Sequence, residues 1–336
     1  MAEFKVLVTD YAWPSLDIET EILQQVDAEL VAARTGEEDE FISLAIDVDA
    51  ILTCWKPVTS PVLDAAERCK VVSRYGIGLD NIAVDQATAL GMIVTNVPDF
   101  CLDEVADHVM ALLLACARRV AQFDRATSQG VWNLKAESNI PRLRGQTLGL
   151  LGFGNTARAL VPRANGFGLK VLAYTPRLAA EGSTANIPEG VEIATSLDAL
   201  LQQSDYISIH VPLTDATRAL IDSTALGQMK SSAYLINTSR GAVIDDDALL
   251  AALRDRRIAG AAIDVTNPEP PEPTHPLLVL DNVVATPHAA FFSQTAIKEL
   301  QEKAARNVVR VLQGEVPQHT VNREVLERPN CRFVAS

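Results

Sequence analysis

The chain has 336 residues, 48% of them hydrophobic, which is enough to build the cores of two domains of ordinary size. Its formal net charge of -14 repels phosphate backbones and anionic lipid surfaces, so neither nucleic acid nor a membrane is expected as a partner. The five cysteines form no C-x-x-C pair, which is typical of reduced thiols in a cytosol, and none is expected to be catalytic.

The sequence suggests neither export nor membrane insertion. The apolar run of residues 109–117 is too short to cross a bilayer and ends at two arginines, so it predicts a buried helix. The first ten residues lack the basic region, long apolar stretch and cleavage site of a secretion signal. We therefore expect a cytoplasmic protein.

Short runs rich in Val, Ile and Leu predict strands of parallel sheets that are covered on both faces. In the first part of the chain these runs include residues 5–9 and 50–53, and a long apolar helix is predicted for residues 102–120. Further strands are predicted at residues 147–151, 170–174, 206–210, 233–238, 260–264 and 282–285.

Charges and prolines mark the later elements. A helix is predicted over residues 248–254, because three aspartates precede it and arginines crowd its end. Residues 268–273 contain too many prolines for a helix or a central strand, so they predict a loop. A last long helix is predicted for residues 293–312.

This alternation predicts an α/β fold with two doubly wound parallel-sheet (Rossmann/flavodoxin-like) domains and a cleft between them. The two long helices are expected to cross between the domains. Residues 1–101 and 291–336 would then form one discontinuous domain, and residues 102–290 would form a domain inserted into it.

A glycine-rich turn follows the strand at residues 147–151. Gly152, Gly154 and Ala157 fit G-x-G-x-x-A, in which the first glycine permits a tight turn, the second admits a pyrophosphate and the small alanine lets helix and strand pack. The inserted domain is therefore predicted to bind a dinucleotide. The other residues assigned to this site are Phe153, Asn155, Thr156, Val211, Pro212 and Thr217.

The end of the next strand bears on cofactor choice. An acidic residue that would bind the adenosine ribose is expected there, but the position is occupied by Thr175, and Arg177 follows two residues later. A neutral Thr beside an Arg favours a 2′-phosphate, so NAD(P) is expected with a preference for NADP(H). The alternative is that Arg177 lies on a solvated loop.

Three polar runs follow the predicted strands of the inserted domain, at the edge where open α/β sheets bind their ligands. They are LINTSRG at residues 235–241, AIDVTNPEP at 262–270 and ATPH at 285–288. With RYGIGLDNI at 74–82 and VTNVP at 94–98, they resemble the D-isomer-specific 2-hydroxyacid dehydrogenases over nearly the whole chain. The C-terminal-binding-protein branch is the most similar part of that family.

The resemblance implies a hydride transfer between NAD(P)H and a 2-oxo acid, which yields the D-2-hydroxy acid. It implies that Arg240 binds the substrate carboxylate and keto oxygen, that Glu269 supports His288 and that His288 transfers the proton. It also places Thr238 and Asp264 beside the nicotinamide, where His288 is expected as well. Glyoxylate, hydroxypyruvate, pyruvate and bulkier acids all remain open as substrates.

The chemistry of these side chains agrees with those roles. Reduction of a 2-oxo group leaves an alkoxide that must be protonated near neutral pH, and an imidazole beside a carboxylate is suited to that task. An arginine offers a planar, permanently charged fork to a carboxylate. Residues 1–101 with 291–336 are the expected substrate-binding domain. Its predicted contacts, together with Phe291, are Arg74, Tyr75, Gly76, Ile77 and Gly78.

Other readings of the same sequence remain open. One is an NAD-responsive corepressor-like scaffold that keeps a dehydrogenase fold, and another is a phosphite dehydrogenase. Formate dehydrogenase is disfavoured because it has Gln where this chain has Glu269. No metal-binding motif is present, so no metal is expected. His108 is expected to be a packing or interface residue, and the helix over residues 102–120 is a candidate interface of a homodimer.

Overall fold

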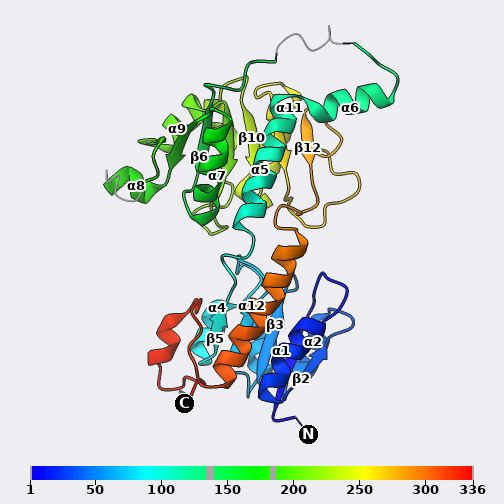
Figure 1. The fold of residues 1–336 in the computed structure, drawn as a ribbon, viewed down its shortest axis with the longest axis vertical. Helices are drawn as coiled ribbons and strands as arrows, with labels where there is room; N and C mark the ends of the chain where they lie inside the picture. Colours follow the sequence, from blue (N-terminus) through cyan, green and yellow to red (C-terminus); the bar gives the residue numbers. More distant parts are fainter. Residues whose placement is uncertain (1, 134–139, 182–186, 335–336) are drawn as a thin grey trace. The chain divides into compact units, whose positions relative to one another are not determined.

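The computed structural model describes residues 2–133, 140–181 and 187–334, and it divides into two compact units (Figure 1). Unit 1 comprises Met1–Cys101 with Ser293–Ser336, and unit 2 comprises Leu102–Phe292. The second crossing of the chain therefore falls at residues 292–293, against the predicted 290–291. Each unit contains one sheet whose paired strands are all parallel.

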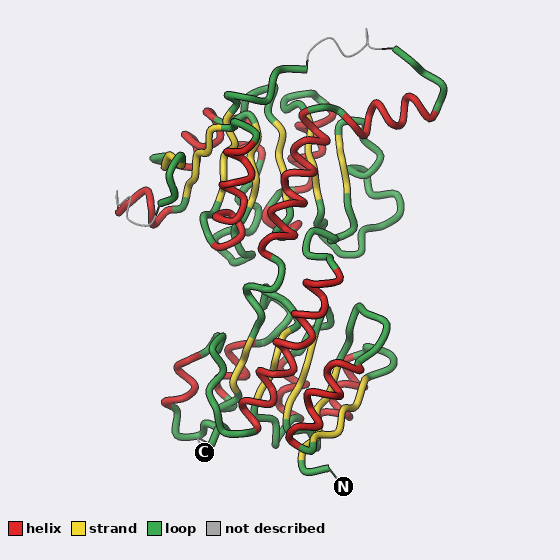
Figure 2. Tube along the Cα trace, in the orientation of Figure 1, coloured by secondary structure: helices red, strands yellow, loops and turns green. Residues whose placement is uncertain are grey.

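Unit 1 is built on a sheet with the strand order β2-β1-β3-β4-β5, the flavodoxin-like order (Figure 2). Its strands are β1 (Phe4–Val8), β2 (Ala28–Ala32), β3 (Ala50–Thr53), β4 (Val71–Arg74) and β5 (Ile93–Thr95). Its α-helices are α1 (Asp17–Leu23), α2 (Glu38–Ala45), α3 (Ser60–Ala65), α4 (Val84–Ala89) and α12 (Gln294–Leu312). The late helix α12 packs on β4 and α1, which ties the end of the chain to its beginning.

Unit 2 is built on a sheet with the order β12-β11-β10-β9-β6-β7-β8, a Rossmann order with one added edge strand. Its strands are β6 (Thr147–Leu151), β7 (Lys170–Tyr174), β8 (Val191–Ile193), β9 (Tyr206–Ile209), β10 (Tyr234–Asn237), β11 (Gly260–Ile263) and β12 (Val283–Ala285). Its α-helices are α5 (Leu102–Ala117), α6 (Val120–Ser128), α7 (Asn155–Gly166), α8 (Pro176–Glu181), α9 (Leu197–Gln203), α10 (Ser223–Gln228) and α11 (Asp246–Arg254). These orders confirm the predicted pair of doubly wound sheets.

Apolar cores cover both faces of the unit 2 sheet. Successive strand residues face opposite sides, so Leu235 joins one core and Ile236 joins the other. The core that contains Ile236 is closed by α5 and α7, and the core that contains Leu235 is closed by α9, α10 and α11. This double burial explains why the strands are continuous apolar runs.

Two helix boundaries differ from the predicted ones, one because of a left-handed residue and one because of an N-cap. The helix predicted over residues 102–120 ends at Ala117, because Arg119 takes a left-handed conformation (φ 51°) and α6 begins after it. α11 begins earlier than predicted, and Asp245 caps it by accepting the N–H of Ala248 at 3.0 Å. Within the described ranges, no helix has the length and apolar character needed to span a membrane.

Candidate active site

The glycine turn after β6 is shaped for close approach. Gly152 has φ 95°, and a Cβ there would lie 2.6 Å from the carbonyl oxygen of His210. Gly154 precedes α7 as its N-cap, and a Cβ there would meet nothing within 4 Å, so the turn has open space in front of the helix. Ala157 is fully buried between helix and sheet. Each of the three positions therefore has the property that the sequence predicts for it.

The residues around this turn fit a dinucleotide. The hydroxyl of Thr238, just beyond β10, is buried and has no hydrogen-bond partner in the described chain, which leaves it available to a bound group. Val211 lies against the Gly152 turn, and Thr217 donates to the carbonyl of Pro212 at 2.6 Å, which stabilises the loop after β9. Open space at the start of a helix and an unpaired buried hydroxyl are what a diphosphate and a nicotinamide need.

Thr175 and Arg177 lie beyond β7. The Thr175 hydroxyl accepts the N–H of Leu178 at 3.1 Å, so it caps the short helix α8. Arg177 is in the first turn of α8 and is exposed. Phe153, in the glycine turn, lies under the guanidinium of Arg158 at 4.6 Å. Asn155 and Thr156 form the first turn of α7.

Three neighbouring strands bring the predicted catalytic loops together. Asn237 of β10 pairs with Ile263 of β11, and Ile263 pairs with Ala285 of β12. The loops that carry Arg240, Glu269 and His288 leave these strand ends in turn. Sheet register, rather than proximity in the sequence, therefore places the three side chains at one edge.

Glu269 and His288 form a direct pair. His288 Nδ1 lies 2.8 Å from Glu269 Oε2, and Glu269 Oε1 accepts the N–H of Thr266 at 2.9 Å. Burial alone would raise the pKa of Glu269, but the hydrogen bond and charge of His288, the Thr266 N–H and the charge of Arg240 outweigh it and lower that pKa. Glu269 is therefore ionised at neutral pH and orients the imidazole.

The loop of Arg240 is fixed by backbone contacts. The Asn237 amide donates to the carbonyl of Arg240 at 2.9 Å, and its oxygen accepts the N–H of Ser239 at 3.0 Å. A Cβ on Gly241 would collide with the backbone of Thr266, so only glycine lets the β10 and β11 loops approach this closely. This close approach brings the guanidinium of Arg240 near enough to Glu269 to influence its pKa.

His288 has a left-handed backbone (φ 51°), an uncommon conformation for a residue other than glycine. Asp264 holds it there. Its carbonyl accepts the N–H of His288 at 2.7 Å, and its two carboxylate oxygens accept the N–H groups of Ala289 and Ala290, each at 2.9 Å. Asp264 is 1% exposed, and both carboxylate oxygens are used inside the protein. Its predicted contact with the nicotinamide stays a prediction.

Sequence reasoning missed two residues beneath this loop. The hydroxyl of Thr286 donates to Asp264 Oδ1 at 2.5 Å, and His108 Nε2 of α5 lies 3.0 Å from the same hydroxyl. The expectation that His108 is a packing or interface residue did not include this polar contact. The only local signal was the position of Thr286 two residues before His288, because the link to His108 spans a long stretch of sequence.

Phe291 lies beside the pair formed by Glu269 and His288. Its ring meets the imidazole of His288 edge-on, with the centroids 6.0 Å apart and the planes at 79°. Phe292 follows it and is 62% exposed. The rings form one aromatic wall next to the imidazole, although the predicted contact of Phe291 with substrate is untested.

The predicted substrate residues of unit 1 lie in the turn after β4. Arg74 is buried and its Nη1 contacts the carbonyl of Tyr75. The Tyr75 ring packs edge-on against Trp13, and its N–H donates to Thr53, so Tyr75 supports the turn rather than exposing a binding group. Gly76 has φ 139°, and a Cβ there would collide with the Arg74 guanidinium. Of the two residues that follow, Ile77 is exposed and Gly78 is half-buried.

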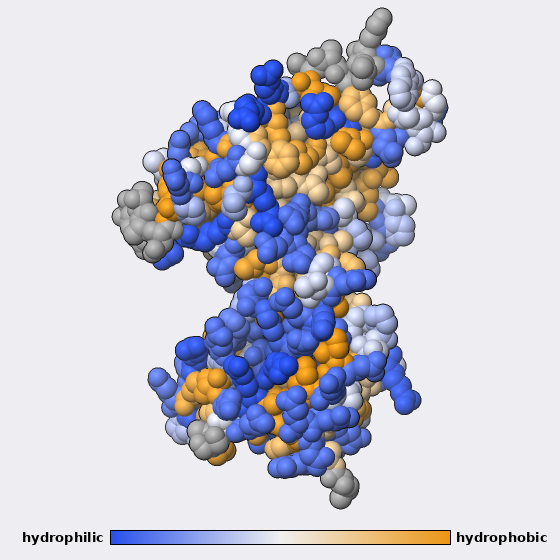
Figure 3. Space-filling view, in the orientation of Figure 1, coloured by the Kyte–Doolittle hydropathy of each residue, from blue (hydrophilic) through white to orange (hydrophobic). Residues whose placement is uncertain are grey.

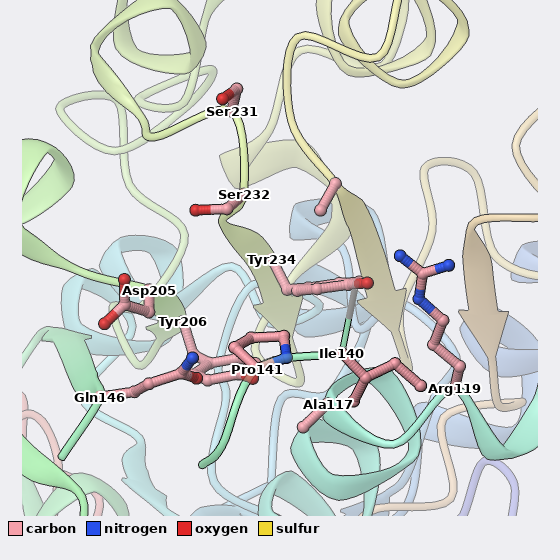
Figure 4. A pocket seen from close by; sticks show the side chains of 11 residues that line it. Ala117, Arg119, Ile140, Pro141, Gln146, Asp205, Tyr206, Ser231, Ser232 and Tyr234 are labelled. Carbon is pink, nitrogen blue, oxygen red and sulfur yellow. The ribbon is translucent and has the colours of Figure 1, made fainter. Parts of the chain in front are cut away.

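A separate cavity of about 450 Å³ lies at the amino ends of the central strands of the unit 2 sheet. It is lined by Tyr206 and Tyr234, the first residues of β9 and β10, and by Ala117 and Arg119 at the end of α5. In Figure 4 the Arg119 guanidinium lies beside the Tyr234 hydroxyl. Because catalytic loops leave the carboxyl ends of the strands, this cavity is not the active site. The described residues contain no cluster of three potential metal ligands.

Comparison with known proteins agrees with the geometry. A family model described as D-isomer specific 2-hydroxyacid dehydrogenase, NAD binding domain, matches residues 110–290. A glyoxylate reductase of Thermofilum pendens is 40% identical over 293 residues, which cover 86% of each chain. A hydroxypyruvate reductase of Thermotoga maritima is 39% identical over 292 residues, which cover 86% of this chain and 92% of that protein.

A solved structure shows the same architecture. A glyoxylate reductase from Paecilomyes thermophila superimposes with a TM-score of 0.84 at 27% identity, covering 96% of this chain and 100% of the other. The family resemblance predicted from the motifs is thus confirmed over most of the chain. The chain belongs to the D-isomer specific 2-hydroxyacid dehydrogenase family and is a nicotinamide-linked oxidoreductase of 2-oxo acid and 2-hydroxy acid pairs.

Proposed function

We propose that the enzyme reduces a small 2-oxo acid to its D-2-hydroxy acid, with His288 as proton donor, Glu269 as its partner and Arg240 as the substrate anchor. The observation that carries this proposal is the 2.8 Å contact between His288 Nδ1 and Glu269 Oε2. The positive charge of Arg240 also helps to lower the pKa of the same carboxyl group. An ionised carboxylate on Nδ1 leaves the other imidazole nitrogen to carry the catalytic proton.

The reaction balances with these groups. The reduced nicotinamide, when bound, supplies the hydride to the carbonyl carbon. The carbonyl oxygen takes the proton from His288, and the neutral imidazole is reprotonated from solvent before the next cycle. Glu269 stabilises the charged imidazole before transfer, and Arg240 pairs with the substrate carboxylate. Binding of the substrate carboxylate by Gly76, Ile77 and Gly78 stays a prediction.

The substrate is proposed from the relatives and the cofactor from two residues. Because similar proteins are a glyoxylate reductase and a hydroxypyruvate reductase, we propose these two acids first and pyruvate third. NADP(H) is proposed over NAD(H) because the residue after β7 is a neutral Thr175 and the exposed Arg177 stands in the next turn.

The direct test is a substrate panel. Purified enzyme is mixed with glyoxylate, hydroxypyruvate, pyruvate or phenylpyruvate and with NADH or NADPH, and loss of the reduced nicotinamide is followed by absorbance. The proposal expects turnover of at least one acid and formation of the D-product. Absence of turnover on the whole panel, from a protein that binds the cofactor and melts cooperatively, would contradict it and would favour a corepressor-like scaffold.

Cofactor preference has its own test. Arg177→Ala removes the proposed contact with the 2′-phosphate, so KM for NADPH should rise about tenfold, as loss of one charged hydrogen bond implies, while KM for NADH stays constant. Arg158→Ala is not a fair control, because Arg158 packs on the glycine turn. Arg254→Ala, at the end of α11, removes an arginine far from β7. Equal changes for both cofactors would count against the preference.

We also propose a homodimer formed through the α5–α6 side of unit 2. Val120 and Val131 are more than half exposed and Trp132 is 90% exposed, all on the chain that continues α5. Figure 3 shows apolar residues over the same face of the unit. A buried tryptophan is typical of the centre of a stable interface, and the two valines would add apolar area around it.

Sedimentation distinguishes this dimer from a monomer. Trp132→Ser should weaken self-association, whereas Phe167→Ser, which removes another exposed aromatic ring of unit 2, should not. A wild-type monomer at every concentration, or an unchanged dimer in the Trp132 variant, would refute the proposed interface.

A further inference from the structure

A buried polar network lies directly under the catalytic histidine. Asp264 Oδ1 accepts two hydrogen bonds, from the Thr286 hydroxyl at 2.5 Å and from the N–H of Ala289 at 2.9 Å. Its Oδ2 accepts the N–H of Ala290 at 2.9 Å. The carboxylate therefore accepts hydrogen bonds from both sides of His288, from Thr286 before it and from Ala289 and Ala290 after it.

The direction of each hydrogen bond follows from the donors available. A hydroxyl has one proton, and that of Thr286 is committed to the Asp264 carboxylate. The contact of 3.0 Å between Thr286 Oγ1 and His108 Nε2 can then form only if Nε2 carries a proton and donates it. His108 Nε2 also lies 3.6 Å from Asp264 Oδ1, so the same N–H faces the carboxylate.

The network stabilises the strained backbone conformation of His288. A left-handed φ of 51° at a non-glycine residue is unfavourable and persists only where surrounding contacts hold it. Asp264 accepts the N–H groups of three successive residues here, and the His288 N–H also faces the carbonyl of Thr286 at 3.2 Å. The Asp264 side chain is oriented in turn by the hydroxyl of Thr286, which His108 contacts. Helix α5 packs against β10, β11 and β12, so His108 is anchored on a rigid element.

We propose that Thr286 and His108 are positioning residues for proton transfer, acting through Asp264 to keep the His288 imidazole aligned on Glu269. This inference rests on the proposed role of His288 and adds a relay that runs from α5 to the catalytic loop. Neither residue touches the reacting atoms. Loss of the relay lets the loop relax away from φ 51°, which moves the proton donor but leaves the glycine turn and Arg240 in place.

The relay predicts a specific kinetic pattern. Thr286→Val keeps the shape of the side chain but removes the hydroxyl, so kcat should fall about 10- to 100-fold, the loss expected when a catalytic group moves by about 1 Å. The dissociation constant of the reduced cofactor should stay constant. The solvent deuterium isotope effect on kcat should rise, because proton transfer becomes slower relative to the other steps.

Matched variants separate positioning from simple loss of stability. Thr286→Ser restores the hydroxyl and should recover most of kcat. His108→Leu should act in the same direction as Thr286→Val, and His108→Gln, which offers an N–H near the same place, should recover part of the loss. Ser204→Ala removes another buried hydroxyl bond of unit 2, from Ser204 to Leu200 at 2.6 Å, and should leave kcat and the isotope effect unchanged.

The outcomes distinguish this proposal from the proposed function. Wild-type enzyme without turnover of any 2-oxo acid overturns the proposed function itself. Wild-type turnover together with a Thr286→Val variant that keeps its kcat and isotope effect overturns only the relay. A fall in kcat that Thr286→Ser does not recover, or that is matched by Ser204→Ala, assigns Thr286 a structural role and also overturns the relay.

Discussion

His210 makes the stability of unit 2 depend on pH in a calculable way. It lies at the end of β9, where its carbonyl oxygen faces Gly152 and its Nε2 lies 2.9 Å from the Ser208 hydroxyl. Burial lowers the pKa of His210 from 6.5 to about 4. The folded protein therefore keeps this imidazole neutral at pH values where the unfolded chain has already protonated it.

The sign and size of the effect follow from linkage. Below pH 6.5 the unfolded state binds more protons at this site than the folded state, so the free energy of unfolding falls as the pH drops from 6.5 towards 4. At about 1.4 kcal/mol for each unit of pKa difference, a fall from pH 7 to pH 4.5 costs the wild type about 2–3 kcal/mol through His210 alone. Above about pH 7.5, where the histidine is neutral in both states, the site contributes no further dependence.

Urea unfolding of wild type and His210→Gln at pH 7 and pH 4.5 measures this contribution. Gln keeps a polar atom near the position of Nε2 and does not titrate, so the difference between the two proteins removes the other titrating groups. We expect the variant to lose about 2–3 kcal/mol less than the wild type over this interval. Parallel losses in both proteins would refute the assignment of a neutral, half-buried His210.

Three further substitutions test the catalytic edge and its packing. His288→Ala should lower kcat about 10²–10⁴-fold, as loss of a general acid does, while the dissociation constant for cofactor measured by fluorescence changes little; normal turnover would remove His288 from the mechanism. Arg240→Lys should lower kcat/KM for a 2-oxo acid about 10- to 100-fold, since a point charge does not replace the bidentate fork; near-wild-type kinetics would contradict that role. Gly241→Ala should destabilise unit 2 in thermal unfolding by about 1–3 kcal/mol because its Cβ meets the Thr266 backbone. Gly227→Ala, in α10 with no atom within 4 Å of the new Cβ, should not, and equal melting shifts in the two variants would disprove the argument.

Local patterns predicted most strands of unit 2, although not the edge strand β8, together with the residues that follow them. The strand at residues 147–151 is β6 as predicted, because a doubly covered parallel strand is an apolar run with a clear end. The residues beyond such ends meet at one edge, so motifs and strand positions together predicted that Arg240, Glu269 and His288 lie near one another.

The network under the catalytic loop could not be predicted in this way. Its contact between His108 and Thr286 depends on how α5 rotates on the sheet and on the register of β12, and neither is encoded by local periodicity. The end of α5 was predicted wrongly for a related reason. Arg119 ends the helical stretch by taking a left-handed conformation, and no glycine or proline at this point of the sequence indicates it.

Burial divides the work between the two carboxylates of the β11 loop. Asp264 is 1% exposed, and its oxygens accept one hydroxyl and two backbone N–H groups, so its charge is used entirely to shape the chain around His288. Glu269, five residues later, keeps one oxygen on a backbone N–H and directs the other to the imidazole. A carboxylate whose oxygens both accept hydrogen bonds from the backbone or a fixed hydroxyl stabilises a strained loop. A partly exposed carboxylate with one oxygen on an imidazole stabilises the protonated form of that imidazole. The same loop therefore fixes the backbone around His288 through Asp264 and orients its imidazole through Glu269.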